Sequence, residues 1–434
     1  MRPIVWADVT NTVEGTGTTG VQRAAKNLLA PLAAGDERLE LRLVRWCEPC
    51  GVFLQLNAAE QERFAAAAPP PTRRVDRLPQ RVRPAARRAA DHPAIRRLNA
   101  AAQAKRQGEH PYAEHRDRST QIDSGTFLDL DAAWHNPLIR TDLLPDLIDR
   151  GVRTATLFHD LFPIEHPDWS DRGTRALFPP WADAHLRSDQ LIVGNSDWTL
   201  RRALDRRRSL GVTDPEVAGV VHLSGEWQAV EVASPGAASP AAASPSPLPP
   251  ELEGLPLDGY VICVATLEPR KNHALLLDAF DRWSTRSPGL GLVLVGRIGW
   301  NTGTLVKRIE THPLLNRQLF WFAHSDDPAM RNMLRLATVA AMPSHTEGFG
   351  LPVLEALALG TPVVTTNGGA LAEVGDDAPL RLPGDDPATW AEALVRHLDD
   401  PHYLARRREE ARAAALTLPT WEDARDELAD LLTR

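Results

Sequence analysis

The chain has 434 residues, of which 43% are apolar and 24% are charged, and its formal net charge is −8. This length allows two domains of ordinary size with substantial apolar cores. The negative net charge argues against nucleic-acid binding by the molecule as a whole. No run of about 18 uncharged apolar residues occurs, so we expect no membrane-spanning helix.

The N-terminal half alternates short apolar runs with helical segments. The first run, at residues 4–7, favours an opening strand over a signal peptide. This alternation predicts an α/β fold with a parallel, doubly wound sheet. Strands are predicted at 4–7, 41–45, 126–130, 154–158, 191–194 and 217–222, and the helices include 21–33, 175–187 and 198–210.

The chain contains three cysteines, Cys47, Cys50 and Cys263. So few thiols indicate a reducing compartment, and we therefore expect a cytoplasmic protein. Cys47 and Cys50 form a C-x-x-C pair, but no second pair accompanies it. We favour spare thiols near a strand end over zinc binding or redox chemistry, and we predict no metal site.

Residues 73–118 form a basic insertion with thirteen Arg or Lys against five Asp or Glu. The segment is rich in Ala, Pro and Arg, and its apolar positions are sparse. We favour a solvated helical insertion or a mobile loop. The alternative is a basic surface that contacts anionic lipid or a phosphorylated acceptor, which would place the protein peripherally at the inner membrane face.

A low-complexity segment at 234–257 separates the two halves of the chain. It is rich in Pro, Ser and Ala and can bury little apolar surface, so we expect a linker there. The predicted domains are 1–233, which includes the basic insertion, and 258–418. A last helix at 419–434 is expected to pack back on the first domain.

The C-terminal half again alternates strands and helices. Two Rossmann-like domains of this kind would face each other across a cleft. Ligands of open α/β sheets bind beyond the carboxyl ends of the strands, so we expect the functional site in that cleft. Strands are predicted at 260–265, 291–295, 319–322, 339–342 and 362–365, and helices at 273–284, 301–311, 328–337, 351–358, 369–374 and 387–398.

The stretch from Pro343 to Leu357 carries the most informative functional pattern. It leads from an apolar strand through a glycine-bearing loop into a helix, and Pro352 suits the first helical turn. A helix N-terminus offers unpaired N–H groups and a favourable dipole to a phosphate. Glu347 and Glu355 flank this anion site, and their carboxylates can accept hydrogen bonds from sugar hydroxyls. The pattern therefore predicts a nucleotide-sugar site.

The same stretch resembles the Glu-x7-Glu motif of retaining GT-B glycosyltransferases of the family-4, or group 1, type, because it encloses Gly-Phe-Gly-Leu-Pro and precedes Gly-Thr-Pro-Val-Val. The resemblance implies a GT-B fold and a metal-independent hexosyltransferase with no cofactor besides its nucleoside-diphosphate-sugar substrate. It implies that Glu347 contacts the donor sugar and Glu355 the ribose hydroxyls. The backbone amides expected to bind sugar and phosphate belong to Gly348, Phe349, Gly350 and Leu351.

Arg270 and Lys271 are adjacent cations just beyond the predicted strand 260–265. Arginine supplies a bidentate fork and lysine a point charge, so the pair could clamp a diphosphate. The surrounding run Glu-Pro-Arg-Lys-Asn resembles a motif of the same family, which implies that both cations neutralise the donor's phosphates. Gly296, after strand 291–295, either lets a nucleotide approach the backbone or forms a tight turn.

Two further segments are candidates in the N-terminal half. Residues 15–20 match G-x-G-x-x-G, but the predicted strand ends too early for a dinucleotide site, so we do not favour NAD binding. The run Thr-Gly-Val-Gln-Arg at 19–23 resembles a loop of mannosyltransferase-like family members, which implies that Gly20 and Arg23 reach donor phosphate. His159 and Asp160 follow strand 154–158, and the resemblance implies that His159 contacts a donor-sugar hydroxyl.

The patterns together with the family resemblance imply a retaining glycosyltransferase of polysaccharide biosynthesis. It would move a hexose, with mannose the favoured example, from a nucleoside-diphosphate sugar to a glycan or lipid-linked acceptor. Arg270 and Lys271 would stabilise the departing diphosphate, and Glu347 would position or stabilise the sugar. Two alternatives stay open: a nucleotide-sugar epimerase or phosphorylase-like GT-B enzyme, and a non-catalytic sugar-nucleotide-binding module.

Overall fold

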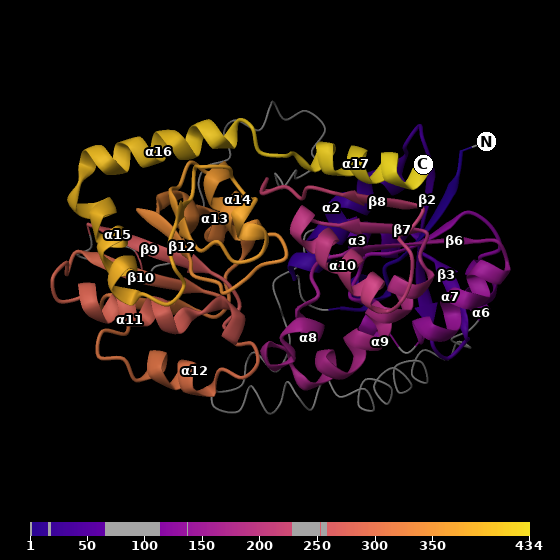
Figure 1. The fold of residues 1–434 in the computed structure, drawn as a ribbon, viewed down its shortest axis with the longest axis horizontal. Helices are drawn as coiled ribbons and strands as arrows, with labels where there is room; N and C mark the ends of the chain where they lie inside the picture. Colours follow the sequence, from indigo (N-terminus) through magenta and orange to yellow (C-terminus); the bar gives the residue numbers. More distant parts are fainter. Residues whose placement is uncertain (1, 16–18, 66–112, 137, 228–251, 253–257) are drawn as a thin grey trace. The chain divides into compact units, whose positions relative to one another are not determined.

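The computed structural model describes residues 2–15, 19–65, 113–136, 138–227, 252 and 258–434. The chain divides into two compact units, Met1–Thr154 and Ala155–Arg434. Figure 1 draws their helices and strands in chain order by colour. Strands alternate with helices in both units, as the sequence pattern predicts.

The first unit is built on strands in the order β4-β3-β2-β1-β5. β1 lies parallel between β2 and β5, but β3 pairs antiparallel with β2 and β4, so the predicted parallel pairing does not hold at this edge. A short turn joins β2 to β3, and a tight turn connects antiparallel strands only. The strands are β1 (Ile4–Asp8), β2 (Glu40–Cys47), β3 (Val52–Gln55), β4 (Ser119–Thr120) and β5 (Thr126–Asp129).

Helix α2 shows how the sequence sets the helices of this unit. It begins at a capping box, in which the Thr19 side chain accepts a hydrogen bond from the Gln22 amide and the Gln22 side chain accepts one from the Thr19 amide. Leu28 and Leu32, four residues apart, are buried on its inner face. The helices described here are α1 (Thr10–Glu14), α2 (Gly20–Ala34), α3 (Ala58–Ala65), α6 (Ala113–Arg118) and α7 (Arg140–Asp149).

A buried ion cluster closes the carboxyl ends of β1 and β5. Arg140, at the start of α7, donates hydrogen bonds to Asp8 and Asp129, each over 2.6 Å. All three side chains are almost completely buried. The one guanidinium therefore pairs with both carboxylates, and loss of Arg140 would leave two buried carboxylates without a cation.

The second unit contains two groups of parallel strands. β6, β7 and β8 are neighbours in one sheet, and β7 pairs parallel with both others. The strands of this group are β6 (Arg153–Phe158), which begins at the boundary between the units, β7 (Leu191–Gly194) and β8 (Val217–Val220). The accompanying helices are α8 (Phe162–Glu165), α9 (Arg172–Ser188) and α10 (Asp197–Ser209).

The second group is a six-stranded sheet in the order β11-β10-β9-β12-β13-β14, in which every pair is parallel. Phe280, Trp283 and Trp390 are fully buried against it, and α11 and α15 pack together on one face. The strands are β9 (Gly259–Val264), β10 (Leu290–Val295), β11 (Leu319–Phe322), β12 (Val339–Met342), β13 (Val363–Thr365) and β14 (Leu380–Arg381). The helices are α11 (His273–Trp283), α12 (Gly303–Glu310), α13 (Asp327–Leu336), α14 (Leu351–Ala358), α15 (Pro387–Asp399) and α16 (Pro401–Ala415).

The prediction of a helix at 369–374 is wrong. Only a single 3-10 turn, η6 (Ala370–Ala372), forms there. Gly369 has a φ of 65°, and the flanking backbone bonds to the loop after β12, with Ala370 N donating to Glu347 O over 2.9 Å. The segment therefore continues that loop, because its backbone groups bond to the loop and are not available for helical hydrogen bonds.

The last helix, α17 (Trp421–Thr433), packs against β8. A β-carbon on Gly219 would lie 2.5 Å from a methyl carbon of Leu431, so helix and strand approach closely. The Trp421 amide and indole both donate to Glu226. The predicted linker at 234–257, apart from Leu252, and the greater part of the basic insertion lie outside the described residues, so the domain limits stay a prediction.

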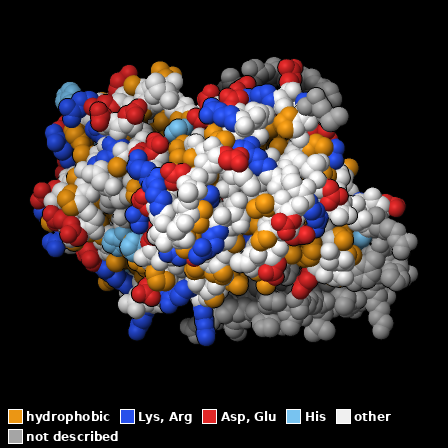
Figure 2. All heavy atoms as spheres, turned by 45° about the vertical axis from the view of Figure 1, so that its right-hand side comes forward, with side chains coloured by type: hydrophobic (Ala, Val, Ile, Leu, Met, Phe, Trp, Pro, Cys, Tyr) orange, Lys and Arg blue, Asp and Glu red, His pale blue; other side chains and the backbone are white. Residues whose placement is uncertain are grey.

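Among the residues the structure describes, no helix has the length and apolar character needed to cross a bilayer. On the face drawn in Figure 2, positive and negative side chains are interspersed with small apolar groups. That face of the described chain therefore carries no broad surface of one charge.

Candidate functional site

Two loops at the same edge of the six-stranded sheet carry the candidate charges. β9 and β12 are adjacent and parallel, so their carboxyl ends lie side by side. Beyond β9 the chain makes a 3-10 turn, η5 (Pro269–Lys271), and beyond β12 a loop leads into α14. His345 N donates to Arg270 O over 2.9 Å, which ties the two loops together through their backbones.

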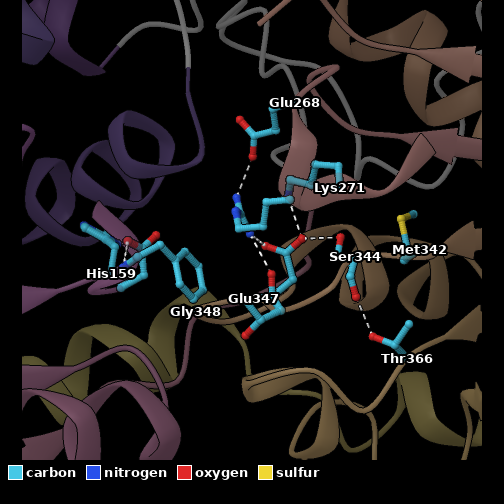
Figure 3. A network of polar contacts seen from close by, with 12 residues as sticks. His159, Glu268, Lys271, Met342, Ser344, Glu347, Gly348 and Thr366 are labelled. Atoms are coloured by element: carbon cyan, nitrogen blue, oxygen red, sulfur yellow. Dashed lines mark hydrogen bonds and ion pairs between the residues drawn. The ribbon is translucent and has the colours of Figure 1, made fainter. Parts of the chain in front are cut away.

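Glu347 is the centre of a polar network (Figure 3). Its Oε1 accepts hydrogen bonds from Lys271 Nζ and from Ser344 Oγ, each over 2.6 Å. Its Oε2 forms an ion pair with Arg270. The Glu347 side chain is 11% exposed and Lys271 13% exposed, so the charges meet in a region with little water. A carboxylate and two cations are thus assembled at one sheet edge.

Arg270 has several further partners. Its guanidinium donates to Glu268 Oε1 over 2.8 Å and to Thr346 O over 2.9 Å. The same group lies 4.8 Å from the ring centre of Phe162, which favours a cation–π contact. These contacts hold the guanidinium plane in one orientation beside Glu347.

The network shifts the acid–base properties of its members. Burial alone would raise the pKa of Glu347, but the charges of Arg270 and Lys271 and hydrogen bonds from Lys271 and Ser344 outweigh it and lower the pKa to about 2. Burial would lower the pKa of Arg270, but the carboxylates of Glu347 and Glu268 raise it. Both groups are therefore charged at neutral pH, and Glu347 has no proton to give as an acid.

A glycine fixes the loop that carries Glu347. The carbonyl oxygen of Gly348 accepts hydrogen bonds from Ser196 Oγ, over 2.7 Å, and from Thr199 Oγ1, over 2.9 Å. A β-carbon on Gly348 would lie 2.0 Å from the carbonyl oxygen of His159. Only a residue without a side chain fits between these backbones, so the loop is anchored to the start of α10.

His159 and Asp160 follow β6, as predicted, and both approach Gly348. Figure 3 shows His159 on the side of Gly348 away from Lys271. The His159 carbonyl accepts a hydrogen bond from Asn195 Nδ2 over 3.0 Å, and its side chain is half-buried. Burial raises the pKa of Asp160 to about 6, although the charge of Arg270 opposes the shift. The structure therefore brings His159 close to the loop of Glu347 through its backbone.

The other predicted donor-binding residues of this loop lie at the start of α14. Gly350 is the N-cap, with a φ of 106° that favours glycine, and Phe349 and Glu355 are buried. Lys271, Ser344, Glu347 and Gly350 border a small pocket at this helix start. A phosphate or sugar placed there would meet both a cation and a helix N-terminus.

Three predicted residues lie away from this network. Gly296 directly follows β10, and a β-carbon there would lie 1.9 Å from the carbonyl oxygen of Ala265, so backbone packing alone accounts for the glycine. Gly20 and Arg23 lie in the first turn of α2, in the other unit. Their part in donor binding stays a prediction.

The structure adds residues that the motif did not single out. Ser344 donates to Glu347, and Glu268 holds Arg270. Ser344 stands three residues before Glu347, in the stretch from Pro343 to Leu357, and Glu268 opens the Glu-Pro-Arg-Lys-Asn run. Both therefore lie inside the motifs of the site. Asp160 and Phe162 approach Arg270 from a segment about a hundred residues away in the chain, and no local pattern could have paired them.

Comparison with solved structures defines the class of fold. Sucrose-phosphate synthase from Thermosynechococcus elongatus matches with a TM-score of 0.60 and 16% identity, covering 99% of this chain and 98% of that one. Alr3699/HepE from Anabaena, solved with UDP and glucose, matches with a TM-score of 0.58 and 14% identity, covering 99% of each chain. The fold is GT-B, with two Rossmann-like α/β parts, which confirms the fold class predicted from the sequence.

Residues 256–414 match the family described as "Glycosyl transferases group 1". This match and the mannosyltransferase relatives confirm, for that region, the resemblance to group 1 glycosyltransferases that the motifs indicated.

Curated relatives include mannosyltransferases. The serotype-specific mannosyltransferase WbdA of Escherichia coli is 26% identical over 302 residues, which are 66% of this chain. A D-inositol 3-phosphate glycosyltransferase of Acidothermus cellulolyticus is 36% identical over 156 residues, covering 34% of this chain and 35% of that protein. The match to WbdA spans only 36% of its length, so the chain covers about a third of that relative.

Proposed function

We propose that this protein is a retaining, metal-independent glycosyltransferase that moves a hexose, with mannose as the first candidate, from a nucleoside-diphosphate sugar to a glycan or lipid-linked acceptor. The observation that carries the proposal is the network of Arg270, Lys271 and Glu347 at the start of α14. The match of residues 256–414 to the group 1 family and the similarity to a mannosyltransferase over 66% of the chain support it. No cofactor is needed besides the donor itself.

The two cations would bind the donor's diphosphate. An ammonium has three N–H donors, and the contact with Glu347 takes one of those of Lys271, so a phosphate oxygen can be reached without breaking it. The guanidinium of Arg270 already faces carboxylates, and phosphate oxygens fit the same fork. Stabilising the charge that develops on the departing diphosphate is the largest electrostatic contribution expected in such a reaction.

Glu347 would act on the sugar as a charged acceptor. Its low pKa keeps it ionised, so it suits hydrogen bonds from sugar hydroxyls and stabilisation of positive charge at an oxocarbenium-like carbon. The acceptor hydroxyl would attack the same face that the diphosphate leaves, with the leaving phosphate taking its proton. Retention of configuration follows from that geometry.

The remaining residues would position the donor. Backbone amides from Gly348 to Leu351 would meet sugar and phosphate, and Glu355 the ribose hydroxyls. His159 would contact a donor-sugar hydroxyl. Donor contacts are also proposed for Gly20, Arg23 and Gly296.

The test is a donor screen followed by a transfer assay. Guanosine, uridine and adenosine diphosphates and their hexose conjugates are titrated while thermal unfolding is followed, because a ligand of the folded state raises Tm. The best donor is then incubated with oligosaccharide acceptors, and the anomeric configuration of the product is read by NMR. Transfer with retention, in buffer without added divalent cations and not increased by adding them, supports the proposal. Donor epimerisation or phosphorolysis, or tight donor binding without transfer to any acceptor, would refute it.

We further propose a cytoplasmic location, with peripheral contact between the basic segment 73–118 and anionic membrane. In a flotation assay, vesicles that contain phosphatidylglycerol should retain the protein, and salt should release it. Equal retention by neutral phosphatidylcholine vesicles would contradict this.

A further inference from the structure

Three side chains with metal-binding atoms converge in the first unit, and none of them belongs to the proposed donor site. Sγ of Cys47, Sγ of Cys50 and a ring nitrogen of His115 all lie within 4.8 Å of one another. His115 Nδ1 is 3.1 Å from Cys50 Sγ and 3.5 Å from Cys47 Sγ. Cys47 is buried, and the other two side chains are half-buried, so a small ion could reach the cluster from solvent.

The two cysteines are presented by a tight turn. Cys47 is the last residue of β2, and the chain reverses over residues 48–51 before β3 begins. The carbonyl of Cys47 accepts hydrogen bonds from the amides of Cys50, over 3.1 Å, and Gly51, over 2.8 Å. Gly51 has a φ of 65°, a left-handed conformation that favours glycine. The turn therefore holds both thiols at one end of the hairpin.

The histidine comes from a distant part of the sequence. His115 lies on α6, 65 residues beyond Cys50. Arg118 on the same helix donates to Gln55 O over 3.0 and 2.8 Å, which fastens α6 to β3 independently of the cluster. Sequence spacing did not connect His115 with the C-x-x-C pair because the histidine is so far away in the chain.

We propose that Cys47, Cys50 and His115 bind a thiolate-preferring divalent ion, zinc first of all, as a structural site. A C-x2-C pair with a histidine is a donor set that zinc favours. In a tetrahedral zinc site, sulfur and nitrogen ligands lie roughly 3.5 Å apart, and the separations of 3.1 and 3.5 Å are close to that value. The three groups therefore need little movement to receive the ion, and water would complete the coordination.

Such an ion would join two parts of the chain that are far apart in sequence. It would link the β2–β3 hairpin to α6, where the described chain resumes after residue 112. Both thiols would lose their protons to become ligands, so binding would release protons and stabilise the fold. This role is independent of glycosyl transfer, and a metal-independent reaction is compatible with it.

The test measures metal in the full-length protein, purified with a reductant and without a chelator. Mass spectrometry should find about one zinc per chain, and replacement by cobalt should give the absorption band of cobalt–thiolate charge transfer. The double variant Cys47→Ser, Cys50→Ser and the variant His115→Ala should each lose the metal, whereas His115→Cys, which keeps a ligand, should retain it. Cys263→Ser is the matched control, because that buried thiol lies in β9 of the other unit and should leave the zinc content unchanged.

Circular dichroism shows whether each variant folds, and His115→Ala, at a half-buried position, is the variant least prone to misfold. Zinc-free protein that takes up no zinc on titration would overturn the proposal. So would equal zinc content in the wild type and the double variant, or a Cys47–Cys50 disulfide that forms in air and persists with zinc present.

Discussion

Lys271 Nζ donates a 2.6 Å hydrogen bond to Glu347 Oε1, and this contact joins the loop after β9 to the loop after β12. The carboxylate thus neutralises a cation that the proposal assigns to the diphosphate. A phosphate that binds another N–H group of Lys271 would share the lysine's charge with Glu347 while the contact persists, so that more of the carboxylate's charge is available to a sugar hydroxyl. Diphosphate binding and sugar recognition are therefore expected to be coupled through one ion pair.

The first prediction concerns the two partners of that ion pair. Lys271→Ala and Glu347→Ala should each lower kcat/KM for transfer by about a hundredfold or more, corresponding to a loss of about 3 kcal/mol of transition-state stabilisation. The lysine variant should also bind nucleoside diphosphate more weakly, as measured by calorimetry. Lys307→Ala, at an exposed position of α12, is the matched control and should behave as wild type. Near-normal rates in both site variants would remove the proposed mechanism.

The second prediction is that ionised Glu347 stabilises the folded protein and that this stabilisation is lost at acid pH. Its pKa is lowered from 4.5 to about 2 in the folded state, so the folded protein binds fewer protons than the unfolded chain between these values. The stabilisation is present above pH 4.5 and is lost as the pH falls towards 2, with a total on the order of 3 kcal/mol. The unfolding free energies of the wild type and of Glu347→Gln, measured in urea, should therefore converge as the pH is lowered from 6 to 3. Parallel curves would show that Glu347 is not ion-paired.

Asp160 should show the opposite dependence. Burial raises its pKa from 3.8 to about 6, so the folded protein binds more protons than the unfolded chain in this range. The unfolding free energy of the wild type should therefore decline, relative to that of Asp160→Asn, as the pH rises from 4 to 6. Chemical denaturation of both proteins at several pH values measures the difference. A constant difference across this range would mean that Asp160 titrates at its ordinary pKa.

The elements around the site could be predicted because their signals are local. β12 and α14 have the predicted limits, since an apolar strand, Pro352 at the helix start and Gly360 after its end are all adjacent in sequence. The antiparallel β3 was missed because it follows β2 directly after a turn, and its other partner, β4, lies far away in the chain. The helix predicted at 369–374 failed because the backbone of that segment pairs with the loop of Glu347.

In the candidate site, too, residues in local motifs could be predicted, whereas contacts between distant segments could not. Glu347, Arg270 and Lys271 could be proposed because each belongs to a short motif, and sheet topology brings the motifs together. The contacts of Arg270 with Phe162, and of His115 with Cys50, join segments far apart in the chain, and tertiary packing alone determines them. Periodicity and spacing carry no information about such pairs.

The last prediction concerns the glycine that anchors the loop of Glu347. A β-carbon at Gly348 would lie 2.0 Å from His159 O and 2.9 Å from Asp160 Cβ, and the first of these is backbone that cannot swing aside. Gly348→Ala should therefore displace the loop, lower the unfolding free energy by about 1–3 kcal/mol and reduce transfer more than stability alone accounts for, because Glu347 is the preceding residue. Gly303→Ala is the matched control: a β-carbon there meets nothing within 4 Å, so stability should change by less than about 1 kcal/mol. Thermal unfolding and transfer assays of both variants make the comparison, and an active, stable Gly348→Ala protein would show that the loop is not held against His159.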